Sequence, residues 1–317
     1  MNRFLKVFSL IALTTFFASC GNDDDVKVAP PRDYGVQYAS DKDSVEVFLK
    51  NHYVVLNTET FNATFPALAD YTGTEPAPLS IWDQTEYPLR NIKTTRNEVE
   101  YTVYYLSFRD GVNDSPTMAD NINFTYRGML FDGTQFDYRE NSTSESPLFQ
   151  LVPGWLDVLP LFKSGNYVDN NDGNPASFTD YGAGAMFLPS GLAYFNAVPP
   201  GNLVGSYACM VFTFQLLDVT YTDIDGDGIL NKDEVATPGG SPEFYDTDGD
   251  EIPNYLDTDD DNDGRLTKDE LRKPGTIKEF YTYADLFKED GTLKEEFKCS
   301  PSSIFPKYLD DTCKGGL

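Results

Sequence analysis

The chain has 317 residues, of which 40% are hydrophobic and 14% aromatic, so it can bury the cores of two or three domains. Its 24 basic and 51 acidic residues give a formal net charge of −27. Negative charge on this scale repels a polyanion, which argues against nucleic acid as a partner.

The chain begins like a signal peptide. Arg3 and Lys6 precede an apolar run over residues 8–18, which is too short to span about 30 Å of hydrocarbon. The run ends in Ala18-Ser19-Cys20, which resembles a bacterial lipobox. The resemblance implies that residues 1–19 are removed and that Cys20 then carries a lipid. The alternative is an ordinary secretory signal with an incidental cysteine.

Residues 20–33 form an acidic, proline-containing tether behind Cys20. This tract resembles the surface-export signal of lipoproteins from the Bacteroidetes group, although a short acidic run is also typical of a plain solvated tether. The resemblance implies an outer-membrane lipoprotein that is held to the membrane through Cys20. It leaves open whether the protein faces the periplasm or the cell surface.

Residues 34–97 carry few structural signals. Asp43-Ser44, followed by apolar residues at Val45 and Phe48, predicts a short capped helix. We expect a small N-terminal extension that packs on the next domain, with dimerisation as an alternative role. His52 lies here and is the one histidine of the sequence, which argues against a hydrolase triad and a histidine-rich zinc site.

The domain that we expect over residues 98–220 begins with an alternating strand from Val99. A second strand over residues 121–130 enters a turn at Asp132-Gly133, and Asp-Gly between such runs is a strong hairpin signal. Pro153-Gly154-Trp155 then opens an amphipathic helix. Its apolar face is predicted to carry Trp155, Val158, Leu159 and Phe162.

These motifs resemble the FKBP family of peptidyl-prolyl isomerases. The family pattern Y-x-G-x-L-x-D-G-x-x-F-D is matched by Tyr126, Gly128, Leu130, Asp132-Gly133 and Phe136-Asp137, and its helix start by Val152-Pro153-Gly154-Trp155. Residues 188–195 resemble the family's P-x-x-x-A-Y loop, and residues 203–219 resemble its closing strand. The resemblance implies an α+β fold, in which an antiparallel sheet wraps around one short helix.

The resemblance also implies a prolyl isomerase that acts on proline-containing polypeptides, needs no cofactor for catalysis and assists folding outside the cytoplasm. Trp155 would form the floor of the pocket, and Val152 would supply a wall and a backbone N–H. Asp137 would orient a polar group at the rim, and Tyr194 would donate its hydroxyl. The remaining walls would be Tyr126, Phe136 and Phe212, with Leu203 and Val204 as a substrate-binding flap.

Three departures from the family pattern concern the edges of this pocket. The chain between Phe149 and Val152 is shorter than in small family members, residues 163–180 form a polar insertion, and the flap over residues 198–207 has its own sequence. Two other functions therefore stay open. One is a chaperone or binding module without turnover, and the other is a structural surface protein with a calcium-binding spacer.

Residues 221–272 are expected to bind calcium, because their acidic residues are regularly spaced. From Asp223 to Glu270 there are 17 acidic and 3 basic residues. Alternate carboxylates, a glycine at the turn and a glutamate at the twelfth position meet the EF-hand loop pattern twice. The ligands predicted for these two loops are Asp223, Asp225, Asp227, Ile229 and Glu234, then Asp259, Asp261, Asp263, Arg265 and Glu270, where Ile229 and Arg265 stand at the backbone-carbonyl position.

A third loop lies between these two and departs from the pattern. Glu251 stands in place of the turn glycine and Asp257 in place of the closing glutamate, so we expect its site, with Asp246, Asp248 and Asp250, to be weaker. The run resembles bacterial thrombospondin type 3 repeats, which implies structural Ca²⁺ ions strung along loops. A regulatory EF-hand pair is the alternative.

Residues 273–317 contain a predicted helix near residues 283–287. Cys299 and Cys313 are expected to pair in an exported protein. Cys209, within the expected closing strand, is interpreted as a buried and inert thiol.

Overall fold

The computed structural model describes residues 30–141, 144–169, 177–201, 203–235 and 240–313. The predicted signal peptide and Cys20 lie outside these ranges. Within them, no helix combines the length and the apolar character needed to cross a membrane.

The first helix, α1, runs over Tyr34–Asn51, so the prediction of a short helix capped by Asp43-Ser44 was wrong. Its N-cap is Asp33, whose carboxylate accepts a hydrogen bond from the Val36 N–H at 2.9 Å. The buried face continues toward the N-terminus at helical spacing through Asp41 and Gln37. Because these buried residues are polar, the hydrophobic pattern did not reveal the first half of the helix.

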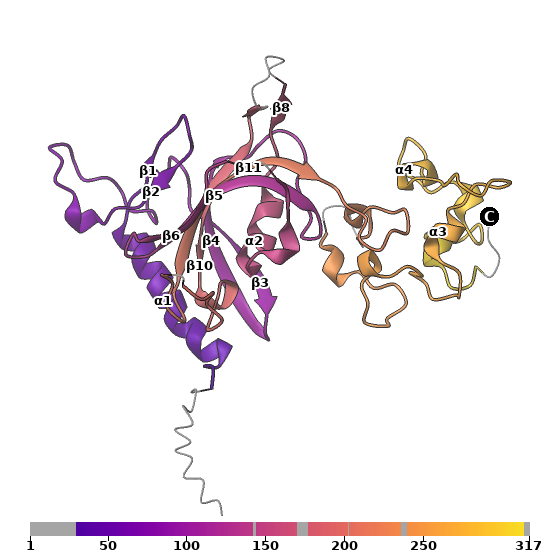
Figure 1. The fold of residues 1–317 in the computed structure, drawn as a ribbon, viewed down its shortest axis with the longest axis horizontal. Helices are drawn as coiled ribbons and strands as arrows, with labels where there is room; N and C mark the ends of the chain where they lie inside the picture. Colours follow the sequence, from indigo (N-terminus) through magenta and orange to yellow (C-terminus); the bar gives the residue numbers. More distant parts are fainter. Residues whose placement is uncertain (1–29, 142–143, 170–176, 202, 236–239, 314–317) are drawn as a thin grey trace, which may run out of the picture. The chain divides into compact units, whose positions relative to one another are not determined.

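A seven-stranded antiparallel sheet is built from strands between residues 90 and 220 (Figure 1). Along its edge-to-edge order the strands are β3 (Arg90–Arg96), β4 (Val99–Arg109), β10 (Gly182–Leu188), β11 (Met210–Thr220), β5 (Asn121–Leu130) and β6 (Gln135–Arg139), and β7 (Ser146–Pro147) pairs with β5. The strand predicted over residues 121–130 is confirmed. The turn at Asp132-Gly133 is confirmed as well, with Gly133 at φ +85°.

The sheet begins at Arg90, earlier than the domain start that we expected at residue 98. Strand β3 pairs with β4 from Arg90↔Tyr105 to Arg96↔Val99. Asn97 and Glu98 connect them with φ of +50° and +60°, the conformation of a two-residue hairpin turn. The sequence signal was weak because β3 is mostly polar and its turn lacks glycine.

Both faces of the sheet are covered. On one face lies α2 (Pro153–Val158), continued by the 3₁₀ turn η3 (Leu159–Leu161), and the predicted apolar face of this helix is buried there. On the other face, Val45, Phe48 and Leu49 of α1 pack against the sheet together with Ile81. The N-terminal extension therefore packs on the domain, as expected, and every residue of β10 is buried.

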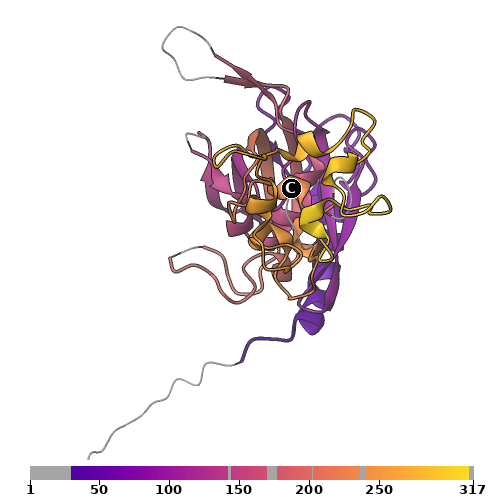
Figure 2. The ribbon, with the colours of Figure 1, turned by 90° about the vertical axis from the view of Figure 1, so that its right-hand side faces the viewer.

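Shorter elements complete the domain. They are β1 (Val55–Leu56), β2 (Ala63–Thr64), η1 (Leu68–Asp70), η2 (Leu148–Gln150) and η4 (Ser190–Leu192). The polar insertion forms a hairpin of β8 (Asn166–Val168) and β9 (Ser177–Thr179), which projects from the sheet (Figure 1 and Figure 2).

A buried carboxylate ties α1 to η4. Asp41 Oδ2 accepts hydrogen bonds from the Ser190 backbone N–H at 2.9 Å and from the Ser190 hydroxyl at 2.6 Å. Its Oδ1 accepts a hydrogen bond from Gln37 Nε2 at 2.6 Å. Since η4 leads directly into Tyr194, this network fixes the helix against the loop that carries a predicted site residue.

Replacing Asp41 by alanine is expected to lower the free energy of unfolding by about 1–3 kcal/mol, because buried donors on Ser190 and Gln37 would lose their acceptor. Urea denaturation of the purified protein measures this change. Asp43→Ala is the matched control, since Asp43 lies on the exposed face of the same helix. Equal stability of the two variants would contradict the anchoring role of Asp41.

The described residues between 221 and 313 contain little regular structure. Their helical elements are η5 (Asn231–Asp233), η6 (Pro242–Phe244), η7 (Asn254–Leu256), α3 (Thr267–Glu270), α4 (Tyr283–Leu286), η8 (Glu295–Phe297) and η9 (Lys307–Leu309). The helix predicted near residues 283–287 is confirmed as α4. A small core holds the segment together, formed by Ile229, Leu271, Leu286, Leu293, Phe297 and Tyr308.

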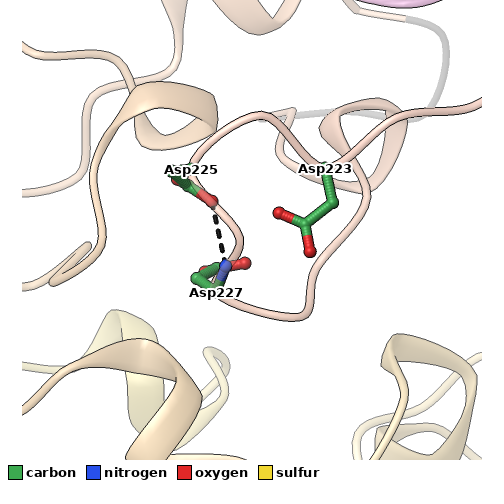
Figure 3. A group of neighbouring side chains, drawn as sticks. All are labelled: Asp223, Asp225 and Asp227. Carbon is green, nitrogen blue, oxygen red and sulfur yellow. Dashed lines mark hydrogen bonds between the residues drawn. The ribbon is translucent and has the colours of Figure 1, made fainter.

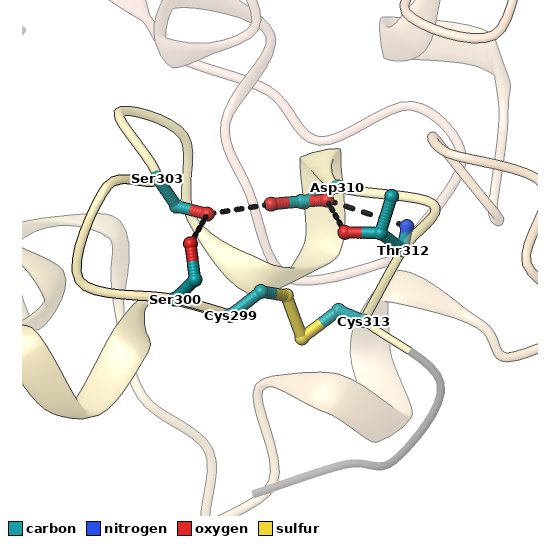
Figure 4. Close-up of a disulfide and its surroundings, with 6 residues drawn as sticks. All are labelled: Cys299, Ser300, Ser303, Asp310, Thr312 and Cys313. Carbon is teal, nitrogen blue, oxygen red and sulfur yellow. Dashed lines mark hydrogen bonds between the residues drawn. A yellow bond between two sulfur atoms is a disulfide. The ribbon is translucent and has the colours of Figure 1, made fainter.

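The pairing predicted for the two C-terminal cysteines is confirmed. Cys299 and Cys313 form a disulfide beside a network in which Asp310 accepts hydrogen bonds from Ser303 and Thr312 (Figure 4). Cys209 lies just before β11 and is partly buried. Burial raises the pKa of its thiol to about 12, which keeps the thiol protonated, as expected for an inert cysteine.

Candidate active site and cation-binding loops

A cavity of about 140 Å³ opens above the start of α2. Six of the seven predicted catalytic residues line it: Tyr126 from β5, Asp137 from β6, Val152 and Trp155 from the start of α2, Tyr194 after η4, and Phe212 from β11. The sheet and the helix thus bring residues from five chain segments together.

The register of two central strands brings the aromatic rings together. Phe212 on β11 lies opposite Gly128 on β5. A Cβ atom at Gly128 would stand 2.7 Å from the Phe136 ring and 2.8 Å from the Phe212 ring. Glycine is therefore required at this position, because any side chain would displace the two rings.

Trp155 lines the cavity and is almost fully buried. Its side chain is 3% exposed, and its ring centroid lies 4.9 Å from that of Phe212 and 5.7 Å from that of Tyr126. The rings meet in tilted and edge-on orientations, which aromatic pairs prefer. This cluster gives the cavity an aromatic, apolar side.

The polar side of the cavity is built around Asp137. Its Oδ2 accepts a hydrogen bond from the Tyr126 hydroxyl at 2.8 Å, and its Oδ1 accepts one from the Tyr138 N–H at 2.8 Å. Burial is the main cause that raises the pKa of Tyr126, and the hydrogen bond to Asp137 raises it further. Burial and the Asp137 charge also raise the pKa of Tyr194. Both phenols therefore stay protonated at neutral pH, and each keeps an O–H group that can donate a hydrogen bond.

The other predicted pocket residues lie outside the cavity lining. Phe136 packs against two of the lining residues, with its ring centroid 5.7 Å from that of Phe212 and 6.4 Å from that of Tyr194. Of the predicted flap, Leu203 is 67% exposed and Val204 packs in the core, and the cavity lining includes neither of them.

Three further residues line the cavity and were not predicted: Phe124, Gln150 and Leu151. A signal was available for Phe124, because it lies two residues before Tyr126 and thus on the same face of β5. Gln150 and Leu151 directly precede Val152, in the shortened segment of the chain.

The acidic residues of the second part of the chain converge in the three predicted loops. In each loop, three carboxylate oxygens lie within 4.8 Å of one another. The groups are Asp223, Asp225 and Asp227 (Figure 3), Asp246, Asp248 and Asp250, and Asp259, Asp261 and Asp263. Internal hydrogen bonds repeat between loops: Asp223 Oδ2 accepts from the Gly228 N–H and Asp246 Oδ2 from the Glu251 N–H, each at 3.1 Å.

Several of these carboxylates are buried and orphaned. Glu234 and Glu270 are 2% and 3% exposed, and none of their carboxylate oxygens accepts a hydrogen bond from a residue that the structure describes. A buried, unpaired carboxylate is unfavourable unless a cation balances it. Hard oxygen donors at this spacing fit Ca²⁺, so the donor set passes this test for a metal site.

Without a cation, these loops are expected to be more stable at lower pH. Burial is the largest cause that raises the pKa of these carboxyl groups, and repulsion from neighbouring carboxylates adds to it. The pKa is about 10 for Glu234, about 9 for Asp260 and about 8 for Asp225. A raised pKa means that the folded state binds protons more tightly than the unfolded state does. The resulting stability is complete below the ordinary carboxyl pKa of about 4 and is lost as pH rises through 8 to 10.

We therefore expect metal-free protein to resist proteinase K within residues 223–270 better at pH 6 than at pH 9. Cleavage of the unfolded chain at each pH supplies the correction for protease activity. Equal protection at the two pH values would contradict the burial of these carboxylates.

The middle loop differs from its neighbours, as its sequence indicated. Glu251 adopts φ +75°, a conformation that glycine fills in the other two loops at Gly228 and Gly264. Asp257 stays outside the cluster of its loop and accepts a hydrogen bond from the Asp259 N–H at 3.0 Å. In the described part of the segment, single turns such as η5 and α3 follow the loops, in place of the long helices of an EF-hand.

Three bacterial proteins are similar in sequence to part of this chain. It is 28% identical over 130 residues to a probable FKBP-type peptidyl-prolyl cis-trans isomerase, FkpA, of Neisseria meningitidis, covering 40% of each chain. It is 27% identical over 130 residues to the peptidyl-prolyl cis-trans isomerase Mip of Coxiella burnetii, covering 40% of this chain and 47% of that one. It is 26% identical over 111 residues to the outer membrane protein MIP of Legionella longbeachae, covering 34% of this chain and 40% of that one.

FKBP-type isomerases of bacteria are therefore homologues of this chain at low identity. The chain spans less than half of the length of these three relatives. Among solved structures, FkpA from Escherichia coli matches with a TM-score of 0.34 and 20% identity, over 59% of this chain and 61% of that one. A family model described as BamM C-terminal matches residues 217–296, which contain the acidic loops.

Proposed function

We propose that this protein is an exported peptidyl-prolyl cis-trans isomerase that assists protein folding outside the cytoplasm. The observation that carries the proposal is the cavity with an aromatic floor at Trp155 and polar groups at Asp137 and Tyr194. Homology with FKBP-type isomerases supports it. Proline-containing polypeptides are the proposed substrates.

The proposed mechanism uses no acid, base or nucleophile. Rotation about a peptide bond has a barrier of about 18–20 kcal/mol, because the planar amide is conjugated. The proline ring would rest on Trp155 between Tyr126 and Phe212, and the dry walls would remove water from the preceding carbonyl. A twisted amide has lost its conjugation, so an apolar environment favours it over the planar ground state.

The polar groups would hold the substrate backbone on either side of the proline. The Val152 N–H at the start of α2 and the Tyr194 hydroxyl are the proposed donors to substrate carbonyls. The hydrogen bond from Tyr126 to Asp137 would hold both side chains in place at the rim. These contacts would fix the chain while the prolyl bond turns.

The acidic loops are proposed to hold structural Ca²⁺ ions, which would supply the charge that their buried carboxylates require. Lipidation of Cys20 and attachment to the outer membrane are proposed from the lipobox-like sequence. The resemblance to an outer membrane protein of Legionella longbeachae is consistent with that location.

Exchange spectroscopy by NMR separates an isomerase from a binding module. A short Leu-Pro peptide interconverts between cis and trans in about 10–100 s without a catalyst. With a small amount of the full chain, we expect exchange cross-peaks between the two forms within a second. Peptide resonances that shift on binding while exchange stays slow would overturn the isomerase and leave the non-catalytic chaperone or binding module.

A further inference from the structure

Asp260 is a buried carboxylate that the loop pattern does not use. Its side chain is 1% exposed, and both of its carboxylate oxygens lack a hydrogen-bond partner among the residues that the structure describes. It precedes the ligand position Asp261 and is absent from the carboxylate group of its own loop. A full charge in this position needs a partner.

Comparison of the three loops shows that a carboxylate is present at this position only in the third loop. In each loop the backbone N–H at the second position donates to a side chain seven residues later: Ile224 to Asn231, Thr247 to Asn254 and Asp260 to Thr267. These three residues are therefore structurally equivalent. The first two loops carry isoleucine and threonine there, so the loop itself does not require a carboxylate.

Asp260 meets two carboxylates of the first loop. One oxygen each from Asp227, Glu234 and Asp260 lies within 4.8 Å of the others, and all three residues are buried. Glu234 contributes two orphaned oxygens and Asp227 contributes one, as judged among the described residues. Loops that are 33 positions apart in the sequence, between Asp227 and Asp260, thus share one group of oxygen ligands.

We propose that Asp227, Glu234 and Asp260 bind a second divalent cation, which bridges the first and third loops. Asp227 belongs to this group and to the group of Asp223 and Asp225, so its carboxylate would bridge two ions. Glu234, which the loop pattern assigns to the first loop, has two unpaired oxygens and would contact both ions as well. The inference rests on the proposed calcium binding of the loops and adds to it a site that the loop pattern does not contain.

Charge favours two ions over one. Five carboxylates gather here, and a single divalent cation would leave three negative charges packed together. A second ion removes two of these, and the Lys268 ammonium, which donates to the Gly226 carbonyl at 2.7 Å, offsets another. Carboxylate oxygens that touch two cations at once are compatible with the flexible coordination of Ca²⁺.

The test is a count of bound ions. Full-length protein is freed of metal and dialysed against Ca²⁺ alone, and the bound ions per chain are then measured. Asp260→Thr installs the residue that the middle loop carries at the equivalent position, and Asp260→Asn keeps the shape of the side chain. Asp269→Asn is the control, because Asp269 is an exposed acidic residue of the same segment.

We expect both Asp260 variants to bind one Ca²⁺ fewer than wild type and the control to bind the same number. Unchanged binding in the Asp260 variants would overturn the bridging site while leaving the loop sites intact. A loss of every ion in these variants would also overturn it, because Asp260 would then support the fold of the segment. Wild-type protein that binds no Ca²⁺ would refute the proposed loop sites, and the bridging site with them.

Discussion

Replacement of Trp155 by alanine is expected to reduce the isomerase rate to that of the uncatalysed reaction. The variant loses the indole ring on which the proline ring would rest, and the cavity loses one of its apolar lining side chains. Because Trp155 packs against Phe212 and Phe124, the free energy of unfolding should also fall by about 3–5 kcal/mol. Turnover and urea denaturation are measured on the same preparation.

Phe162→Ala separates these two effects. Phe162 is buried in the same core, with its ring 4.9 Å from that of Phe214, and it does not line the cavity. Its removal should cost a similar amount of stability while the folded protein keeps its turnover. If Phe162→Ala loses as much activity as Trp155→Ala, the effect of Trp155 is one of stability alone.

Removal of calcium is expected to expose residues 223–270 to proteases while the sheet domain stays folded. Converging carboxylates repel one another without a cation, and the small core that includes Ile229 and Leu271 offers little compensation. Ca²⁺ at one hundred times its dissociation constant would add about 2.7 kcal/mol for each independent site. Limited proteolysis in Ca²⁺ and in a chelator measures the difference.

The cleavage sites, read by mass spectrometry, decide the outcome. Protection in Ca²⁺ and cutting in chelator between Asp223 and Glu270 are the expected results. Cleavage that is the same in both conditions would contradict structural calcium in the loops. Cuts within β4 or β11 serve as the internal control, since the central strands should resist in both.

Local patterns predicted the hairpin around Asp132-Gly133 and the helix that starts at Pro153. In both cases a turn residue and a hydrophobic period agree with the final packing. The first half of α1 escaped prediction because its buried side chains, Gln37 and Asp41, are polar and find their partners only in the folded chain. Strand β3 escaped for a similar reason, because it is an edge strand with mostly exposed polar residues.

The residues of the candidate site also fall into a predicted group and a group that the sequence did not reveal. Tyr126, Asp137 and Trp155 belong to motifs that resemble those of the FKBP family, so the sequence predicted that they share one pocket. The structure has all three in the lining of one cavity. Phe124 and Leu151 line the same cavity without belonging to a motif. Asp260 lies one position away from the alternating ligands, so the loop pattern does not include it. Its proximity to Asp227 and Glu234 of the first loop arises only in the folded chain, and no local spacing encodes it.

The rate of cis-trans isomerisation of a proline-containing tetrapeptide tests the central claim most directly. Wild-type protein is measured in Ca²⁺ and in a chelator, beside the Trp155→Ala variant. We expect wild-type catalysis well above the uncatalysed rate and equal in both conditions, because every residue that lines the cavity precedes the acidic loops. A wild-type rate no higher than that of Trp155→Ala would contradict an isomerase site in this cavity.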